Sequence, residues 1–172
     1  MLRACQAIDA AIDWLSRWTL SVSGTVLLAV LLLGIALRYV FTESLPWATE
    51  LPTLLFPIFV MAGIVLAAQH GQHVAVEFLL NLLPTNGRRV LLVLVNLLVA
   101  VSYVVLSNTI VAVLPIAASE HTPILGVPGT VVYGALLLGF ALVVVTAITA
   151  TIKVAIAGEA ALPKPDHTAD PA

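Results

Sequence analysis

The chain has 172 residues, of which 61% are hydrophobic and 9% are charged, and its mean hydropathy is +1.12. Soluble domains usually carry about 25% charged residues, so this composition excludes an ordinary soluble protein. Cys5 is the single cysteine, which excludes an intrachain disulfide and a multi-cysteine metal site. The net charge of −2 says little, because in a membrane protein the position of each charge matters more than their sum.

Four long stretches contain no charged residue and no histidine. They cover residues 20–37, 51–68, 90–118 and 127–152. About 20 apolar residues in a helix cross the hydrocarbon core, and lipid forces each crossing segment to satisfy its own backbone polar groups. We therefore predict an all-α integral membrane protein with four transmembrane helices in one domain, residues 1–158. The expected spans are residues 20–40, 46–69, 90–118 and 127–152, and the proline-containing residues 159–172 are expected to form a disordered tail.

The distribution of cations predicts the orientation. Four crossings place both termini and the middle loop on one side, and that side carries six of the seven Lys and Arg residues: Arg3, Arg17, Arg88, Arg89, Lys153 and Lys164. Only Arg38 lies on the other side. The positive-inside rule then predicts cytoplasmic N- and C-termini, with external loops at residues 39–50 and 119–126.

The first residues are amphipathic. In residues 3–18, the apolar residues Ile8, Ile12, Leu15 and Trp18 recur at helical spacing, and polar residues occupy the other side. This pattern predicts a helix lying in the membrane interface, with Trp14 and Trp18 at the depth of the lipid headgroups. A simple N-terminal extension of the first span fits the pattern equally well.

A second interfacial helix is predicted between spans two and three, over residues 73–84. Arg88 and Arg89 follow it, at the depth where they can meet anionic lipid headgroups. Before span two, Ser44 is a suitable helix cap, and Pro46 fits the first turn of a helix.

The predicted spans carry no ionisable residue at their centres, where such residues usually mark ion or substrate paths. Asn96, Tyr103 and Ser107 lie near one face of span three, where they can form hydrogen bonds between helices or line a ligand site. The four histidines lie at span ends, in loops or in the tail, so paired haem ligation is not expected. No catalytic triad, phosphate-binding loop or metalloprotease motif is present. We predict no cofactor, no metal site and no enzyme activity.

The external loop between spans one and two mixes charges with aromatic residues. Arg38 ends span one and Glu50 begins span two, so the two residues are expected at similar depth, where they can pair. Tyr39 and Trp47 lie between them. This composition fits an ordinary interfacial belt, and it equally fits a docking edge, since Arg, Tyr and Trp dominate the energetics of interfaces.

Three segments together resemble the small permease subunit of tripartite ATP-independent periplasmic (TRAP) transporters, over roughly residues 15–155. The first segment contains Arg38, Tyr39, Phe41, Ser44, Leu45, Trp47, Glu50 and Leu51. The second contains His73, Val76, Glu77, Leu83, Pro84, Arg88 and Arg89, and the third contains Pro123, Leu125, Gly126, Pro128 and Tyr133. One departure is Thr49, which stands where the family often has an additional acid.

The resemblance implies a partner role in the bacterial inner membrane. In such systems a large permease subunit carries the substrate and sodium sites, and a periplasmic substrate-binding protein captures the substrate, usually an organic acid. The small subunit is expected to be a non-catalytic scaffold beside the large one. The positions that carry this expectation are Arg38, Tyr39, Trp47, Glu50, His73, Pro123, Gly126 and Pro128.

Two other functions fit four apolar helices. One is a stand-alone membrane enzyme for redox chemistry or lipid modification. The other is a small homo-oligomeric channel with Asn96, Tyr103 and Ser107 in its lumen.

Overall fold

The computed structural model describes residues 2–40, 46–70 and 85–157. These residues form four α-helices: α1 (Leu2–Val40), α2 (Pro46–Gln69), α4 (Thr85–Ser119) and α5 (Thr130–Ala157). All four are long and apolar enough to cross a membrane, which confirms the predicted number of spans. At 1.5 Å per residue, α2 is about 36 Å long and the 39 residues of α1 extend over about 58 Å.

The helix boundaries follow the local sequence closely. Helix α2 begins at Pro46, as the missing proline N–H and its fixed φ favour. Helix α1 runs without a break from Leu2 to Val40. This continuity matches the interpretation of residues 3–18 as an extension of the first span, and the depth of this segment in the membrane stays a prediction. The second predicted interfacial helix, residues 73–84, lies outside the described residues.

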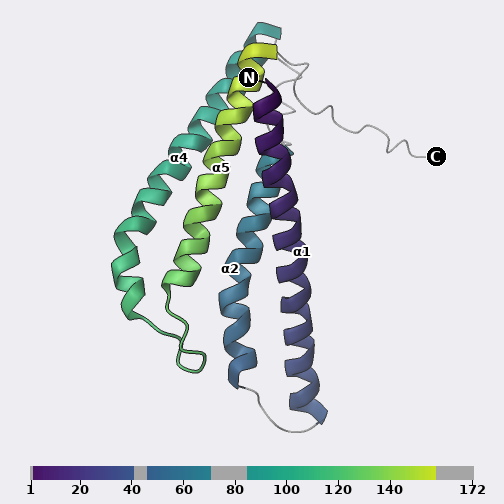
Figure 1. The fold of residues 1–172 in the computed structure, drawn as a ribbon, viewed down its shortest axis with the longest axis vertical. Helices are drawn as coiled ribbons and strands as arrows, with labels where there is room; N and C mark the ends of the chain where they lie inside the picture. The colour runs from purple at the N-terminus through teal and green to yellow at the C-terminus, as the bar shows by residue number, and fades with distance from the viewer. Residues whose placement is uncertain (1, 41–45, 71–84, 158–172) are drawn as a thin grey trace, which may run out of the picture.

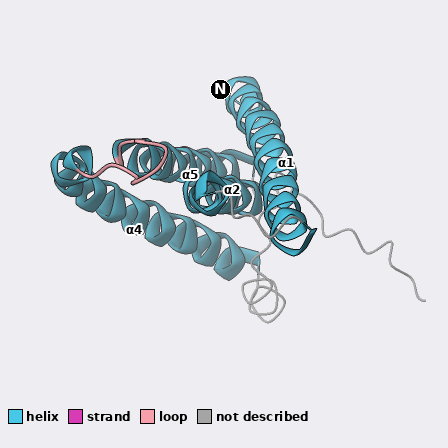
Figure 2. Cartoon of the chain, turned by 90° about the horizontal axis from the view of Figure 1, so that it is seen from below, coloured by secondary structure: helices cyan, strands magenta, loops and turns pink. Residues whose placement is uncertain are grey.

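The four helices form an open row rather than a closed bundle (Figures 1 and 2). Helix α1 packs on α2, α2 packs on α5, and α5 packs on α4, while α1 touches α5 more lightly. The molecule is thus two helical hairpins, α1–α2 and α4–α5, joined through α2 and α5. We call the lower end in Figure 1, where each hairpin turns, the loop end. The opposite end, with the N-terminus and the last turns of α5, is the terminal end.

Small residues allow the central helices to approach closely. A Cβ atom at Gly139 of α5 would lie 2.5 Å from Cε of Met61 and 3.1 Å from its Cβ. A Cβ atom at Gly24 of α1 would lie 2.9 Å from the ring of Phe59 in α2. Glycine therefore sets the spacing at two helix contacts, as small residues commonly do between membrane helices.

The centre of the row is apolar. Ile12, Val65 and Val143 are buried together, and Tyr103 of α4 meets Phe140 of α5 edge to face, with ring centroids 5.3 Å apart. The expected hydrogen bonds between helices are not formed by Asn96 and Ser107. Asn96 donates to the carbonyl of Leu92 and Ser107 to that of Tyr103, so both of these bonds lie within α4.

Candidate functional site

Glu50 joins the two hairpins at the loop end. Its two carboxylate oxygens accept hydrogen bonds from the backbone N–H groups of Ile124 and Leu125, each at 2.9 Å. Glu50 lies in the first turns of α2, whereas Ile124 and Leu125 lie in the loop between α4 and α5. A carboxylate that accepts two backbone N–H groups forms charge-assisted bonds, which are stronger than neutral ones. Glu50 thus fixes this loop against α2.

The tip of the α4–α5 loop is a tight turn. The N–H of Thr122 donates to the carbonyl of Val127 at 3.0 Å, and the N–H of Gly126 donates to the carbonyl of Thr122 at 3.1 Å. The Thr122 hydroxyl accepts from the N–H of Val127 at 3.0 Å. Gly126 has a φ of 63°, a left-handed conformation that glycine adopts without the steric penalty of a side chain. The loop is therefore ordered by its own backbone.

The base of the same loop is equally constrained. The N–H of Gly129 donates to the carbonyl of Glu120 at 2.9 Å, and His121 and Pro128 form an antiparallel bridge. A Cβ atom at Gly129 would lie 2.9 Å from the carbonyl oxygen of Ala117. Pro128 and Gly126, which the sequence singled out for a partner role, thus have demonstrable roles in shaping the loop.

This ordered loop displays apolar side chains. Ile124 is 50% exposed and Leu125 is 38% exposed, and Pro123 beside them is exposed as well. Trp47 is half-buried near the start of α2, and Tyr39 at the end of α1 is 82% exposed. The loop end therefore combines a rigid apolar tip with two aromatic side chains.

Arg38 and Glu50 are not paired. Both oxygens of Glu50 are engaged by the loop, the Arg38 side chain is exposed, and no ion pair links the two within residues 2–40, 46–70 and 85–157. The predicted pair is not formed because both oxygens of the Glu50 carboxylate accept hydrogen bonds from backbone N–H groups of the α4–α5 loop. These donors lie 74 and 75 residues further along the chain.

The residues predicted to meet lipid headgroups are only partly described. Trp14 and Trp18 are 63% and 57% exposed, with ring centroids 6.2 Å apart. Arg89 is exposed near the start of α4. The side chain of Arg88 lies outside the described residues, and so does His73, which was predicted for the partner interface rather than for the headgroups. The headgroup depth of all these residues stays a prediction.

At the terminal end, a network of polar side chains connects three helices, and the sequence analysis did not predict it. Asp9 of α1 forms an ion pair with Lys153 of α5 and accepts from the hydroxyl of Thr149 at 2.7 Å. The side-chain amide of Gln69 in α2 donates to the backbone carbonyl of Asp9 at 3.1 Å. Asp9 and Lys153 are only 21% and 22% exposed at their side chains. Three helices therefore meet at Asp9.

A second set of contacts continues this network toward solvent. Arg17 donates to Asp13 at 2.7 Å, and an Arg17 nitrogen lies 3.2 Å from Nε2 of His70. Nδ1 of His70 lies 2.9 Å from the carbonyl oxygen of Leu66. Since arginine can only donate, Nε2 accepts from Arg17, and Nδ1–H donates to Leu66.

Residues from both predicted faces of residues 3–18 thus pack inward: Asp9 contacts α2 and α5, and Ile12 from the predicted apolar face is in the core. Ile12 and Ser16 are buried, whereas Ile8, Leu15 and Trp18 are exposed. The sequence contained a usable signal: Cys5, Asp9, Ile12 and Ser16 follow each other at steps of four, three and four, the spacing of a helix-packing seam. The sequence analysis grouped Ile12 with the exposed apolar residues and did not identify this seam, in which Ile12 is buried.

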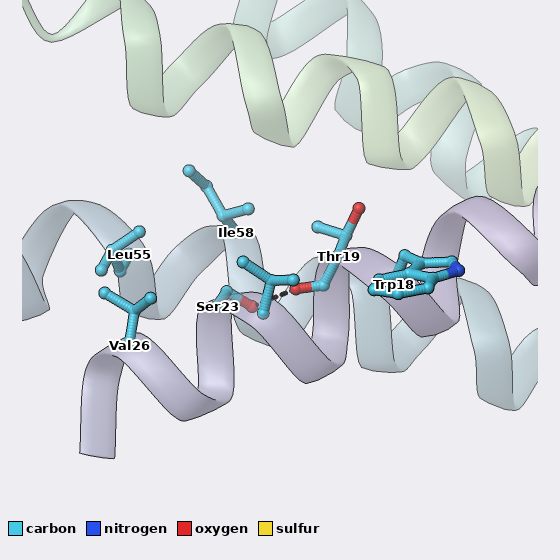
Figure 3. Close-up of a pocket in the computed structure, with 7 residues that line it drawn as sticks. Trp18, Thr19, Ser23, Val26, Leu55 and Ile58 are labelled. Atoms are coloured by element: carbon cyan, nitrogen blue, oxygen red, sulfur yellow. Dashed lines mark hydrogen bonds between the residues drawn. The ribbon is translucent and has the colours of Figure 1, made fainter. Parts of the chain in front are cut away.

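A shallow groove lies away from both polar ends. It is a groove of about 400 Å³ between α1 and α2, lined by Trp18, Thr19, Val22, Ser23, Val26, Leu55 and Ile58. Figure 3 shows the Ser23 hydroxyl donating to the carbonyl of Thr19, at 2.5 Å. No charged side chain lines this groove, so it offers nothing to hold an ionic substrate.

These features define a class of protein: a multi-pass membrane protein whose polar groups join its own helices at both ends. Residues 27–156 match the family described as "Tripartite ATP-independent periplasmic transporters, DctQ component". The match covers most of the chain, and the chain belongs to this family, the small permease subunits of TRAP transporters.

Individual relatives agree with this assignment. The chain is 30% identical over 105 residues to the ectoine TRAP transporter small permease protein TeaB of Halomonas elongata, covering 60% of this chain and 54% of TeaB. It is 37% identical over 145 residues to the uncharacterized protein y4mM of Sinorhizobium fredii, covering 84% of this chain but 27% of that protein. It is 38% identical over 93 residues to the sialic acid TRAP transporter permease protein SiaT of Haemophilus influenzae, covering 52% of this chain and 15% of SiaT. The chain thus spans about a quarter of y4mM and a smaller share of SiaT.

Proposed function

We propose that this chain is the non-catalytic scaffold subunit of a sodium-coupled secondary active importer of organic acids. In this proposal it packs against a large permease subunit, which works with a periplasmic substrate-binding protein. The chain resides in the bacterial inner membrane with both termini in the cytoplasm, so that the loop end faces the periplasm.

The observation that carries the proposal is the pair of polar contacts that close the two ends of the row. Glu50 ties α2 to the α4–α5 loop at one end, and Asp9 ties α1 to α5 at the other. Between them the α2–α5 contact is apolar and closely packed at Gly139. Such an arrangement suits a rigid support, because the ionisable side chains of these two contacts, as far as the structure describes them, bond to each other or to backbone groups.

The arrangement gives less support to a self-sufficient channel. A channel lumen would need polar groups free to meet water or ions, whereas Asn96 and Ser107 are bonded to their own helix. Helix α4, which carries both residues, lies at the edge of an open row.

The proposal is tested in native membranes. A tagged copy of this chain, extracted in mild detergent, is expected to co-purify with a much larger multispanning protein, identified by mass spectrometry. Deletion of the chain is expected to abolish sodium-dependent uptake of the organic acid that the intact system imports. Recovery of the chain as a monomer or homo-oligomer only, with uptake unchanged after deletion, would contradict the proposal.

A further inference from the structure

The loop between α4 and α5 pairs all of its backbone donors. Every N–H group present from Thr122 to Gly129 donates a hydrogen bond, and the structure describes each of these residues. Pro123 and Pro128 have no N–H group. The acceptors are the two Glu50 oxygens, the Thr122 hydroxyl and carbonyl oxygens of the loop itself. A loop exposed to water does not need such a complete set, because water can accept from any N–H group that is left over.

Glu50 fixes the depth of this loop relative to the membrane. Helix α2 is the candidate span Pro46–Gln69; it is about 36 Å long and, when centred, extends about 3 Å beyond each side of a hydrocarbon core of about 30 Å. Glu50 follows Pro46 by one helical turn, or about 6 Å along the axis, which places it at the edge of that core. Ile124 and Leu125 donate to its carboxylate, so their backbone lies at the same level. In Figure 1 the loop accordingly stops short of the end of α1 and lies beside the start of α2.

The side chains of this loop are apolar at its tip and polar at its base. Pro123, Ile124 and Leu125 are exposed at the tip, and Glu120 and His121 are exposed at the base. Ionisable side chains are costly in the hydrocarbon core, so Glu120 and His121 favour the headgroup layer, within reach of water. The apolar tip gains free energy when acyl chains replace water around it.

We infer that the α4–α5 loop is immersed in the lipid leaflet at the loop end, with Pro123, Ile124 and Leu125 at the boundary between headgroups and acyl chains. This lipid contact goes beyond the proposed function and does not depend on it. Acyl chains offer no acceptor, so a backbone segment that meets them must pair its own N–H groups, as this loop does. A protein partner would bring acceptors of its own and would not require the complete set. Residues 119–126, predicted as an external loop, are by this inference part of the membrane interface.

Fluorescence quenching measures the depth of the tip. In a Cys5→Ser background, Leu125→Cys or His121→Cys carries an environment-sensitive fluorophore. The full chain is purified with its associated proteins and returned to phosphatidylcholine vesicles. At position 125 we expect blue-shifted emission, strong quenching by a phospholipid with a nitroxide near the glycerol end of its acyl chain, and weak quenching by iodide. At position 121, the control in the same loop, we expect iodide to quench more strongly.

The other outcomes of this measurement contradict the inference. Iodide quenching that is as strong at position 125 as at position 121 would place the tip in water. Protection of position 125 from both quenchers would show that a protein covers the tip, which would overturn the inference as well. Neither result bears on whether a large subunit co-purifies with the chain, so the proposed function is tested separately.

A matched pair of substitutions tests the need for paired N–H groups. Thr122→Val removes the hydroxyl that accepts from the N–H of Val127, whereas Thr122→Ser keeps a hydroxyl there. Acyl chains cannot replace the lost acceptor, so the thermal unfolding midpoint in vesicles should fall for Thr122→Val and stay close to wild type for Thr122→Ser. Equal midpoints for the two variants would show that water takes the place of the hydroxyl, and the loop would then not be immersed in lipid.

Discussion

The contacts of Glu50 in the structure give it a different role from the one that the sequence suggested. The sequence allowed a pair with Arg38 or a contact with a partner protein, whereas both of its oxygens hold the α4–α5 loop. Glu50 thus positions Ile124 and Leu125, whose side chains are exposed, and under the proposed function its contribution to a partner interface is indirect.

Replacing one of these oxygens tests that role. In Glu50→Gln one acceptor becomes an NH₂ group, which faces a backbone N–H and cannot accept from it. We expect a loss of about 1 kcal/mol in the stability of the loop, since a hydrogen bond to a charged group is lost at a partly exposed site. Hydrogen–deuterium exchange at Ile124 and Leu125 should accelerate, whereas Glu120→Gln, an exposed acid in the same loop, should leave it unchanged. Equal exchange in both variants would show that Glu50 does not hold the loop.

Asp9 has the corresponding role at the terminal end. Asp9→Asn leaves Lys153 partly buried without its acid, which is more costly than losing an exposed pair. We expect the thermal unfolding midpoint in detergent to fall clearly for Asp9→Asn and by much less for Asp13→Asn, whose partner Arg17 lies on the same helix and is exposed. The double variant Asp9→Asn/Lys153→Met should recover part of the loss. If the two single variants behaved alike, the interhelical pair would not be a structural contact of consequence.

At the scale of the helices, the number of spans was predictable because it depends on length and hydropathy alone. The start of α2 at Pro46 was predictable for a similar reason, since helix-capping chemistry is local. The contacts that organise the site were not predictable. Thr149 and Lys153 lie 140 and 144 residues from Asp9, and no local pattern specifies which distant group satisfies a given carboxylate.

The direction of helix faces was the other unpredictable feature. Amphipathicity suggested that Ile8, Ile12, Leu15 and Trp18 mark one surface of residues 3–18; Ile8, Leu15 and Trp18 are exposed, whereas Ile12 is buried. In a membrane, however, apolar side chains can face lipid, so polar side chains on the same helix can pack against other helices. Asp9 and Ser16 occupy the inner side because α2 and α5 offer partners there, whereas lipid offers none.

The contact between α2 and α5 makes a prediction at this scale. Gly139→Val places new atoms against Met61, whose Cε and Cβ already lie 2.5 Å and 3.1 Å from an added Cβ. We expect a loss of about 1–3 kcal/mol in stability, typical of an overpacked core. Gly134→Val in the purified chain is the control, because its added atoms meet nothing. Thermal unfolding that is equally affected by both substitutions would argue against a close α2–α5 contact.

At the scale of the whole molecule, the distribution of cations predicts the orientation in the membrane. We expect the loop end outside and the terminal end inside. In a Cys5→Ser background, His121→Cys should react with a membrane-impermeant thiol reagent applied to spheroplasts, and Gln6→Cys should react only after the membrane is permeabilised. Both positions are exposed, so the difference reports sidedness. The opposite labelling pattern would reverse the orientation.

The pairing of Asp9 with Lys153 also has a consequence for biosynthesis. A ribosome makes Asp9 near the start of translation and Lys153 only after α2 and α4 have emerged. Until then the first turns of α1 have neither the ammonium group nor the Thr149 hydroxyl that hold them in the finished molecule. The first turns of α1 are thus made early and secured late, and a nascent chain that stops before α5 keeps Asp9 without its Lys153 partner.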